Sequence, residues 1–312
     1  MGDSERSVSL HSSPVWRLRD RIVPTDRPLV VGILNLTPDS FSDGGLYAHP
    51  EAAIARAFDL VDAGADMVDI GAESSRPGAD PVPEDEEWRR LEPVLTGLGA
   101  LECPISVDTT KSGVARRALG LGAAAINDIS ALRFDPALAG LAAETGAGLV
   151  LMHMRGVPRT MQTDTHYDDL IGQVLDFLQT ALTAAVDRGC VPEQIVLDPG
   201  IGFGKSLEGN LEILARLGSL ASLGRPILVG PSRKTFLGQI LDLPPEERVE
   251  GTIAACVMAL ERGARIFRVH DVRQVRRALD VAHQVREAES CSLAPASCER
   301  VGSAGWAENP KA

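Results

Sequence analysis

The chain has 312 residues, 44% hydrophobic and 24% charged, and its 31 basic and 43 acidic residues give a formal net charge of -12. This charge has the wrong sign for a protein that binds nucleic acid by neutralising phosphates, so no nucleic-acid partner is expected. Its 30 Gly and 20 Pro show no collagen-like period, which excludes a fibrous protein. The length fits either two average domains or one α/β barrel.

Neither the start of the chain nor its apolar runs indicate export or a membrane. Residues 1–13 are polar and lack the hydrophobic stretch of a signal peptide. No apolar run approaches the roughly 18 residues that span a bilayer, so no membrane partner is expected. The five cysteines are odd in number and lack zinc-ligand spacing, which favours reduced thiols. We therefore expect a cytoplasmic protein.

A sequence pattern is repeated through the middle of the chain. In each repeat an Ala/Leu-rich helical run is followed by a Gly-Ala pair and then by a short apolar run. The pairs are Gly64-Ala65, Gly122-Ala123, Gly146-Ala147 and Gly263-Ala264. A helix commonly ends at a residue with a left-handed backbone conformation, which glycine adopts easily, so each repeat predicts a helix that leads into a strand. Further apolar runs lie at 29–34, 104–107, 195–197 and 226–229. About eight strands alternate with helices over roughly 250 residues, which favours a closed barrel over an open sheet.

The predicted fold class is therefore α/β, a single (β/α)8 TIM barrel over residues 28–289. Residues 1–27 form an N-terminal extension, and its segment 16–26 could be a hairpin that caps the barrel floor. Residues 290–312 are rich in Ser, Ala, Gly and Pro without hydrophobic periodicity, which predicts a disordered C-terminal tail.

Every predicted strand ends in a polar residue, where the active sites of such barrels lie. These residues are Asn35, Glu73, Asp108, Asn127, His153, Asp198, Ser232, and Arg268 with His270. A single Asp or Asn in such a place more often caps a helix or forms a turn. Polar residues at all eight ends predict a rim that binds a polar heterocycle, while Arg76, Lys234, Arg268 and His270 predict an anion beside it.

Three loops after strands have unusual compositions. Residues 35–45 and 73–79 combine Pro and Gly with an aromatic or a cation, which predicts lids that order over a ligand. Residues 198–205 superficially resemble a phosphate-binding glycine loop but lack the spacing of a P-loop, so a nucleotide site is not predicted. The histidines show no zinc-ligand spacing.

Seven motifs in order resemble the dihydropteroate synthase family of pterin-binding barrels. They lie at 33–44, 106–109, 126–129, 151–156, 197–200, 232–234 and 268–272, and the resemblance extends from about residue 16 to 285. It implies condensation of 6-hydroxymethyl-7,8-dihydropterin diphosphate with 4-aminobenzoate, giving 7,8-dihydropteroate and diphosphate with Mg²⁺ assisting. It also implies a sulfonamide target.

The resemblance assigns the pterin and the diphosphate to particular residues. Asp198, Asp108 and Asn127 suit the donors and acceptors of a pterin edge, and Met152 lines the same pocket. Lys234 donates to the carbonyl side of the pterin, and the nearby Arg233 would make the pocket more positive. The remaining assignments are Arg268 and His270 to the diphosphate and Asn35 to Mg²⁺. Asp108, Lys234, Arg268 and His270 are the expected catalytic residues.

The 4-aminobenzoate site is expected at Ser75, Arg76, Pro77, Phe203 and Thr235, the last at a helix start where free N–H groups favour a carboxylate. The chain departs from the common family pattern in two places. Ser75 stands where Thr is usual, which keeps the hydroxyl and removes a methyl group. Ile201 stands where an aromatic is frequent, which should change a pocket wall.

Two other functions fit the same barrel. A methyltetrahydrofolate-dependent methyltransferase would share the pterin-binding Asp and Asn residues but would need a corrinoid partner and no diphosphate pocket. A non-catalytic pterin-binding paralogue should lack a loop or a reacting cation, and none is missing here. A homodimer formed through a helix face is a further expectation from the resemblance.

Overall fold

The computed structural model describes residues 15–36 and 50–293, and its main feature is an eight-stranded parallel sheet. Going round the sheet, the strand order is β8, β7, β6, β5, β4, β3, β10 and β9. A parallel bridge between Leu197 on β8 and Ile227 beside β9 closes the sheet into a barrel. The strands are β3 (Leu29–Asn35), β4 (Met67–Gly71), β5 (Ile105–Asp108), β6 (Ala125–Asp128), β7 (Gly148–Met152), β8 (Ile195–Asp198), β9 (Leu228–Val229) and β10 (Ile266–Val269).

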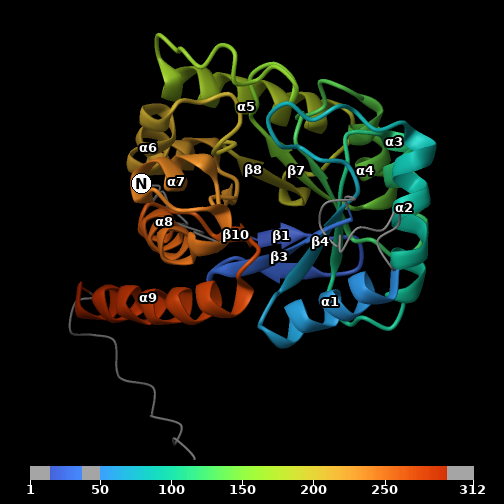
Figure 1. The fold of residues 1–312 in the computed structure, drawn as a ribbon, viewed down its shortest axis with the longest axis horizontal. Helices are drawn as coiled ribbons and strands as arrows, with labels where there is room; N and C mark the ends of the chain where they lie inside the picture. The colour runs from blue at the N-terminus through green and yellow to red at the C-terminus, as the bar shows by residue number, and fades with distance from the viewer. Residues whose placement is uncertain (1–14, 37–49, 294–312) are drawn as a thin grey trace, which may run out of the picture.

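Helices form an outer ring around the strands, and successive helices pack against one another (Figure 1). The α-helices are α1 (Pro50–Asp62), α2 (Glu84–Gly97), α3 (Ser112–Gly120), α4 (Ala137–Thr145), α5 (Leu170–Asp187), α6 (Leu207–Ala215), α7 (Thr235–Leu241), α8 (Val249–Glu261) and α9 (Val272–Leu293). The short 3-10 helices are η2 (Pro192–Gln194), η3 (Leu217–Leu223) and η4 (Pro245–Glu247). The predicted (β/α)8 barrel is confirmed.

The predicted helix-to-strand joints also occur. Gly64, Gly122, Gly146 and Gly263 all have positive φ, between 71° and 103°. A residue with a side chain is strained in this conformation, which explains why Gly recurs at these helix ends.

One boundary differs from the sequence expectation. Helix α9 continues to Leu293, so residues 290–293 are helical and do not belong to an irregular tail. The first turns of this helix pack on the barrel through Val272, Val275 and Leu279, which are buried. Residues 294–312 and the loop residues 37–49 lie outside the described part of the chain.

The N-terminal segment packs under the barrel as an antiparallel hairpin of β1 (Val15–Arg17) and β2 (Ile22–Pro24). Trp16 and Leu18 are each 1% exposed and share an apolar cluster with Leu29, Met67 and other residues at the amino ends of the strands. The Trp16 indole donates to the carbonyl of Gln194 at 3.0 Å. The hairpin therefore seals the end of the barrel opposite the rim of polar residues.

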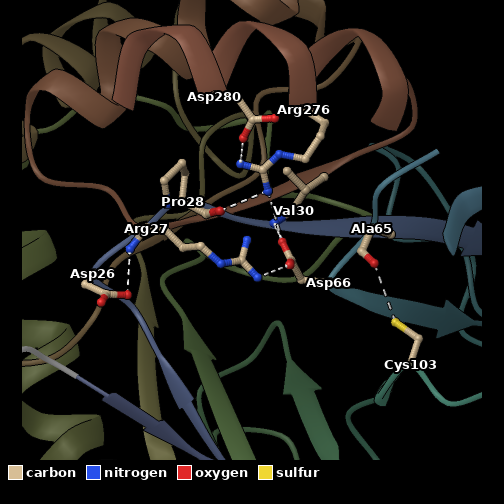
Figure 2. Close-up of polar contacts among 9 residues, drawn as sticks. All are labelled: Asp26, Arg27, Pro28, Val30, Ala65, Asp66, Cys103, Arg276 and Asp280. Carbon is tan, nitrogen blue, oxygen red and sulfur yellow. Dashed lines mark hydrogen bonds and ion pairs between the residues drawn. The ribbon is translucent and has the colours of Figure 1, made fainter. Parts of the chain in front are cut away.

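An ionic cluster around Asp66 ties the last helix to the same end of the barrel (Figure 2). The Asp66 carboxylate accepts from Arg27 at 2.5 Å, from the backbone N–H of Val30 at 2.8 Å and from Arg276 at 3.1 Å. Arg276 also bonds the carbonyl of Pro28 and forms an ion pair with Asp280. One carboxylate thus joins α9, the start of β3 and the turn before β4.

Replacing Asp66 by Asn should lower stability without touching the rim. The amide keeps the shape but leaves Arg276 without its full charge partner, so we expect a loss of about 2 kcal/mol and a melting temperature lower by several degrees. Thermal unfolding followed by circular dichroism measures this. An unchanged melting temperature would show that the cluster does not hold α9 in place.

None of the helices in residues 15–36 and 50–293 combines the length and the apolar content required to cross a lipid bilayer.

Candidate active site

Ion pairs connect three strands of the barrel, β10, β4 and β5. Arg268 on β10 donates through Nε to Asp69 on β4 at 2.6 Å and through Nη2 to Asp108 on β5 at 2.8 Å. Burial raises the pKa of Asp108 to about 7, with Arg268 opposing the rise and Asp69 adding to it. The predicted residues Asp108 and Arg268 therefore meet, and in this structure they are bonded to each other.

Asn127 on β6 joins the same network. Its Nδ2 donates to Asp69 at 3.0 Å, so one of its donors is already used. Ser106 on β5 donates its hydroxyl to the other oxygen of Asp69. Asn127 is 5% exposed and Asp69 is 1% exposed, so the network lies just beneath the rim.

Asp198 ends β8 beside a loop of three left-handed glycines, Gly200, Gly202 and Gly204. One oxygen of Asp198 accepts from the N–H of Gly200 at 2.7 Å, and burial raises the pKa of this carboxyl to about 6. A Cβ on Gly200 would lie 1.9 Å from the carbonyl oxygen of His153, so no other residue fits there without movement. The glycines let the loop fold tightly against the end of β7.

A buried lysine holds this loop from inside. Lys205 is 3% exposed, and its Nζ lies 2.9 Å from each of the carbonyls of Gly200 and Phe203 and from Nδ1 of His153. Burial, followed by the positive charge of Lys205, lowers the pKa of His153 to about 2, so this ring is neutral and can accept. Burial also lowers the pKa of Lys205 to about 7.

The ammonium group of Lys234 lies over the ring of Phe203. The Lys234 ammonium lies 3.9 Å from the centre of the Phe203 ring, a cation–π contact. Burial lowers the pKa of Lys234 to about 8, and the positive charge of Arg268 adds to this, while Asp198 and Asp108 oppose it. All four charged groups therefore lie close enough to influence one pKa, so the residues predicted for the pterin and for the anion lie in the same region of the rim.

An apolar wall lies beside this region. Met152 and Phe203, both predicted, form a buried cluster with Met154, Met161 and Ile129. Ile201, in contrast, is 1% exposed within the main core of the barrel, where it packs with residues such as Leu197. Ile201 and Phe203 thus belong to different apolar clusters, and the effect of Ile201 on a pocket wall stays a prediction.

Ser232 contacts both the backbone and the ring of His270. The Ser232 hydroxyl accepts from the backbone N–H of His270 at 3.1 Å, and the same oxygen lies 3.0 Å from Nδ1 of the ring. The hydroxyl proton can therefore go to Nδ1, which leaves Nε2 as a donor. Burial lowers the pKa of His270 to about 3, and the charges of Arg268 and Arg233 lower it further.

Arg233 lies beside the site and is paired with an acidic neighbour. Its guanidinium forms a bidentate ion pair with Asp271, at 3.0 and 2.6 Å, which offsets part of its charge, yet this charge still lowers the pKa of His270. Its φ of 58° lies in the left-handed region and turns the chain sharply between Ser232 and Lys234. Arg233 thus shapes the loop from which Lys234 extends.

The loop after β4 is anchored at its base and exposed at its tip. Glu73 pairs with Lys111, which also binds Glu87 at 2.5 Å. The tip is a turn closed by Ala79 N–H donating to Arg76 at 3.1 Å, with Gly78 at φ 83°. Gly78 also bonds the carbonyl of Pro158 in the loop after β7. Ion pairs hold the base of the loop, while the tip is hydrogen-bonded to a neighbouring loop.

The predicted 4-aminobenzoate residues are less closely gathered. Arg76, Pro77 and Thr235 are exposed and Ser75 is half-buried. Among the described residues, none of these four has a hydrogen bond or ion pair to the Asp69, Asp108 and Arg268 network. Thr235 does begin α7 as expected.

Asn35 ends β3 with a half-buried amide, next to Gly71 in the register of the sheet. The part of the first loop that follows Leu36 lies outside the described residues. The described part of the chain contains no group of three His, Cys, Asp or Glu side chains that could hold a metal ion.

Three residues of the network were missing from the sequence prediction. Asp69 interrupts the apolar run 67–70 with a charge on the inward face of a strand, which was an available signal. Lys205 ends the glycine-rich segment 198–205, whose lack of P-loop spacing gives no sign of a buried lysine. Lys111 follows β5 by three residues, and only the fold shows that it reaches Glu73 and Glu87.

Comparison with known proteins agrees with this geometry. The family model "Pterin binding enzyme" matches residues 31–270. The chain is 50% identical to the dihydropteroate synthase of Synechocystis over 82% of this chain and 89% of that protein, and 46% identical to that of Bacillus subtilis over 81% and 86%.

Solved structures are similar as well. The Yersinia pestis dihydropteroate synthase in complex with a sulfonamide drug superposes with a TM-score of 0.83 at 42% identity, covering 88% of this chain and 99% of that one. The Thermus thermophilus enzyme with 4-aminobenzoate gives 0.78 at 44% identity, covering 87% and 99%. The chain therefore belongs to the dihydropteroate synthases of the pterin-binding enzyme family.

Proposed function

We propose that the chain condenses 6-hydroxymethyl-7,8-dihydropterin diphosphate with 4-aminobenzoate to form 7,8-dihydropteroate and diphosphate, a step of folate biosynthesis. The observation that carries the proposal is the convergence of Asp108, Asn127 and Asp198 with the cations Lys234 and Arg268 at one rim. The family membership supports it. This set offers acceptors to a pterin and donors to an anion in the same pocket.

The pterin edge is assigned to the buried acceptors. Asp198 has one oxygen bound to Gly200, and among the described residues the other has no partner, so it can accept from the pterin amino group and ring N–H. Asn127 presents its Oδ1, since its Nδ2 faces Asp69. Met152 and Phe203 provide the apolar wall on which the ring packs.

The diphosphate is assigned to Arg268 and His270, while Lys234 is assigned to the carbonyl side of the pterin. His270 can donate from Nε2 while Ser232 holds Nδ1. Arg268 is paired with Asp108 in this structure, and an incoming anion competes for that guanidinium. Binding of the diphosphate would then release the Asp108 carboxylate to face the pterin.

The chemical step breaks the bond between the pterin methylene and the diphosphate oxygen before the new bond forms. The leaving diphosphate takes the electron pair, and the positive charge left on the methylene spreads into the ring, where the Asp108 carboxylate stabilises it. The arylamine nitrogen of 4-aminobenzoate then attacks and loses a proton. Because such a cation is a strong electrophile, the arylamine needs no strong general base to attack it.

Mg²⁺ is part of the proposal. An amide oxygen at Asn35 suits a hard cation, and Mg²⁺ commonly takes most of its ligands from water and substrate phosphates, so the donor set fits. When bound, the ion would neutralise charge on the diphosphate. The chain's own contribution there is the orientation of Asn35 at the end of β3.

Location and assembly complete the proposal. A cytoplasmic location agrees with the free thiols of Cys103, Cys190 and Cys256. A homodimer could use the exposed apolar residues Val281 and Val285 on α9, which are 67% and 56% exposed. Light scattering of the wild type and of Val281→Asp tests this, since a dimer held by α9 should dissociate in the variant.

Growth of a bacterium that lacks its own synthase tests the function. The wild-type chain should restore growth without folate end products, whereas Asp198→Asn should not. A chain that binds a pterin but fails to restore growth would fit the non-catalytic paralogue. Methyl transfer from methyltetrahydrofolate to a corrinoid protein would instead support the methyltransferase.

Pterin affinity should fall in acid. Since the pKa of Asp198 is raised to about 6, its carboxylate takes up a proton below that pH and loses an acceptor. We expect affinity to fall by up to about tenfold per pH unit below pH 6, and this limb should vanish in Asp198→Asn. Calorimetric titration measures it, with the pterin's own titration subtracted.

The same pKa shift has the opposite effect on stability, which separates loss of binding from unfolding. A raised carboxyl pKa favours the folded state at low pH, and this contribution is lost as the pH rises through about 6. The wild type should therefore lose stability relative to Asp198→Asn as the pH rises from 4 to 7. A parallel fall of affinity and stability in acid would contradict the assignment.

The loop after β4 should couple the two substrates. Its exposed tip carries both Arg76, suited to an anion, and Pro77, suited to an aromatic ring. We therefore expect 4-aminobenzoate to bind more tightly once Mg²⁺-diphosphate and a pterin are bound, by roughly 1–3 kcal/mol. Affinity measured with and without these ligands gives the coupling, and Arg76→Ala should reduce it. Equal coupling in the variant would show that the loop does not transmit it.

A further inference from the structure

Asp69 is the buried carboxylate that holds two of the proposed site residues. From β4 it points into the barrel, 1% exposed, and it accepts hydrogen bonds from side chains on three other strands. Its Oδ1 accepts from Ser106, and its Oδ2 accepts from Asn127 at 3.0 Å and from Arg268 at 2.6 Å. Its hydrogen bonds are thus all directed to neighbours within the barrel.

This arrangement decides which edge of Asn127 faces a ligand. A carboxylate can only accept, so the Nδ2 group of Asn127 must face Asp69. The Oδ1 atom is then turned the other way, and it has no partner among the described residues. Without a carboxylate at position 69, the amide could turn over and offer its N–H₂ group instead.

The same carboxylate binds only one nitrogen of the Arg268 guanidinium, Nε. Nε is bound to Asp69 and Nη2 to Asp108, whereas Nη1 has no hydrogen-bond partner in residues 15–36 and 50–293. With Nε fixed, the outer end of the guanidinium can move from Asp108 to another anion by a small rotation. Asp69 therefore provides the pivot for that exchange.

We propose that Asp69 is a positioning residue of the synthase reaction. It presents the acceptor edge of Asn127 to the pterin, and it anchors Arg268 so that the rest of the guanidinium passes from Asp108 to the diphosphate. It acts through Asn127 and Arg268 and touches neither substrate. The inference rests on the proposed function and adds a residue to it.

The test is Asp69→Asn, in which an amide N–H₂ group faces donors that previously met a carboxylate. We expect the affinity for a diphosphate-free pterin and the inhibition by Mg²⁺-diphosphate each to weaken by at least about tenfold. In an Asn127→Ala background, Asp69→Asn should weaken only the diphosphate, because the pterin arm is already removed. A merely structural role would not produce this split.

Asp66→Asn is the matched control, since Asp66 precedes the same strand but binds Arg27 and Arg276 at the opposite end of the barrel. It should lower the melting temperature and leave both ligand constants unchanged. A folded Asp69→Asn protein whose constants stay within about threefold of wild type would overturn the proposal.

If Asp69→Asn does not fold, Ser106→Ala carries the test. It removes the donor to Oδ1 and leaves Asn127 and Arg268 intact, so the loosened carboxylate should weaken both ligands by about three- to tenfold. Changes below about twofold would overturn the proposal. A wild-type protein that binds neither ligand would instead remove the proposed function itself, and it is recognised before any variant is compared.

Discussion

Replacing Asp198 by Asn is expected to weaken pterin binding by about 30-fold or more, equal to at least about 2 kcal/mol. The carboxylate has one oxygen bound to the N–H of Gly200, and the other is available to the donors of the pterin. If the new amide keeps its oxygen on Gly200, its N–H₂ group must face those donors. A buried pair of donors without an acceptor is the costly case, so most of the affinity should be lost.

Calorimetric titration with a diphosphate-free pterin measures this effect, and Asp187→Asn, an exposed carboxylate at the end of α5, is the control. The control should bind as the wild type does. Near wild-type affinity in Asp198→Asn would remove Asp198 from the pterin site. Loss of folding is monitored by the melting temperature of both variants.

Arg268→Ala should have the second large effect, because it leaves Asp69 and Asp108 as buried carboxylates without their shared cation. Breaking a buried ion pair in this way typically costs about 3–5 kcal/mol of stability. Inhibition by diphosphate should be nearly abolished. Pterin affinity should fall too, since both carboxylates belong to the network that contacts Asn127.

His270→Ala separates the diphosphate from the pterin more cleanly. Its ring is bonded to Ser232 and to none of the three pterin acceptors. We expect weaker inhibition by diphosphate, by about tenfold, with pterin affinity nearly unchanged. Equal losses for both ligands would mean that the end of β10 has collapsed, and the assignment of His270 to the anion would lose its support.

The architecture could be predicted because its signals are local. Each Gly-Ala pair indicates the end of a helix at a residue with positive φ, and each apolar run indicates a strand buried on both faces. The polar strand ends followed from the general geometry of barrels, which brings Asp108, Asn127 and Arg268 to one rim. These predictions needed no knowledge of which side chains touch.

The connections within the site could not be predicted, because they depend on which interior side chains meet. Asp69 lies 199 residues from Arg268 along the chain, and only closure of the barrel brings them together. Arg233 and Lys234 are adjacent in sequence, yet one is paired with Asp271 and the other lies over Phe203.

The measurement that most directly tests the central claim counts both products of one reaction. Purified protein is incubated with Mg²⁺, labelled 4-aminobenzoate and pterin diphosphate, and dihydropteroate and diphosphate are quantified together. We expect both products to accumulate in equal amounts, and neither to form at a comparable rate in Asp198→Asn. Release of diphosphate without dihydropteroate, or the absence of both, would contradict it.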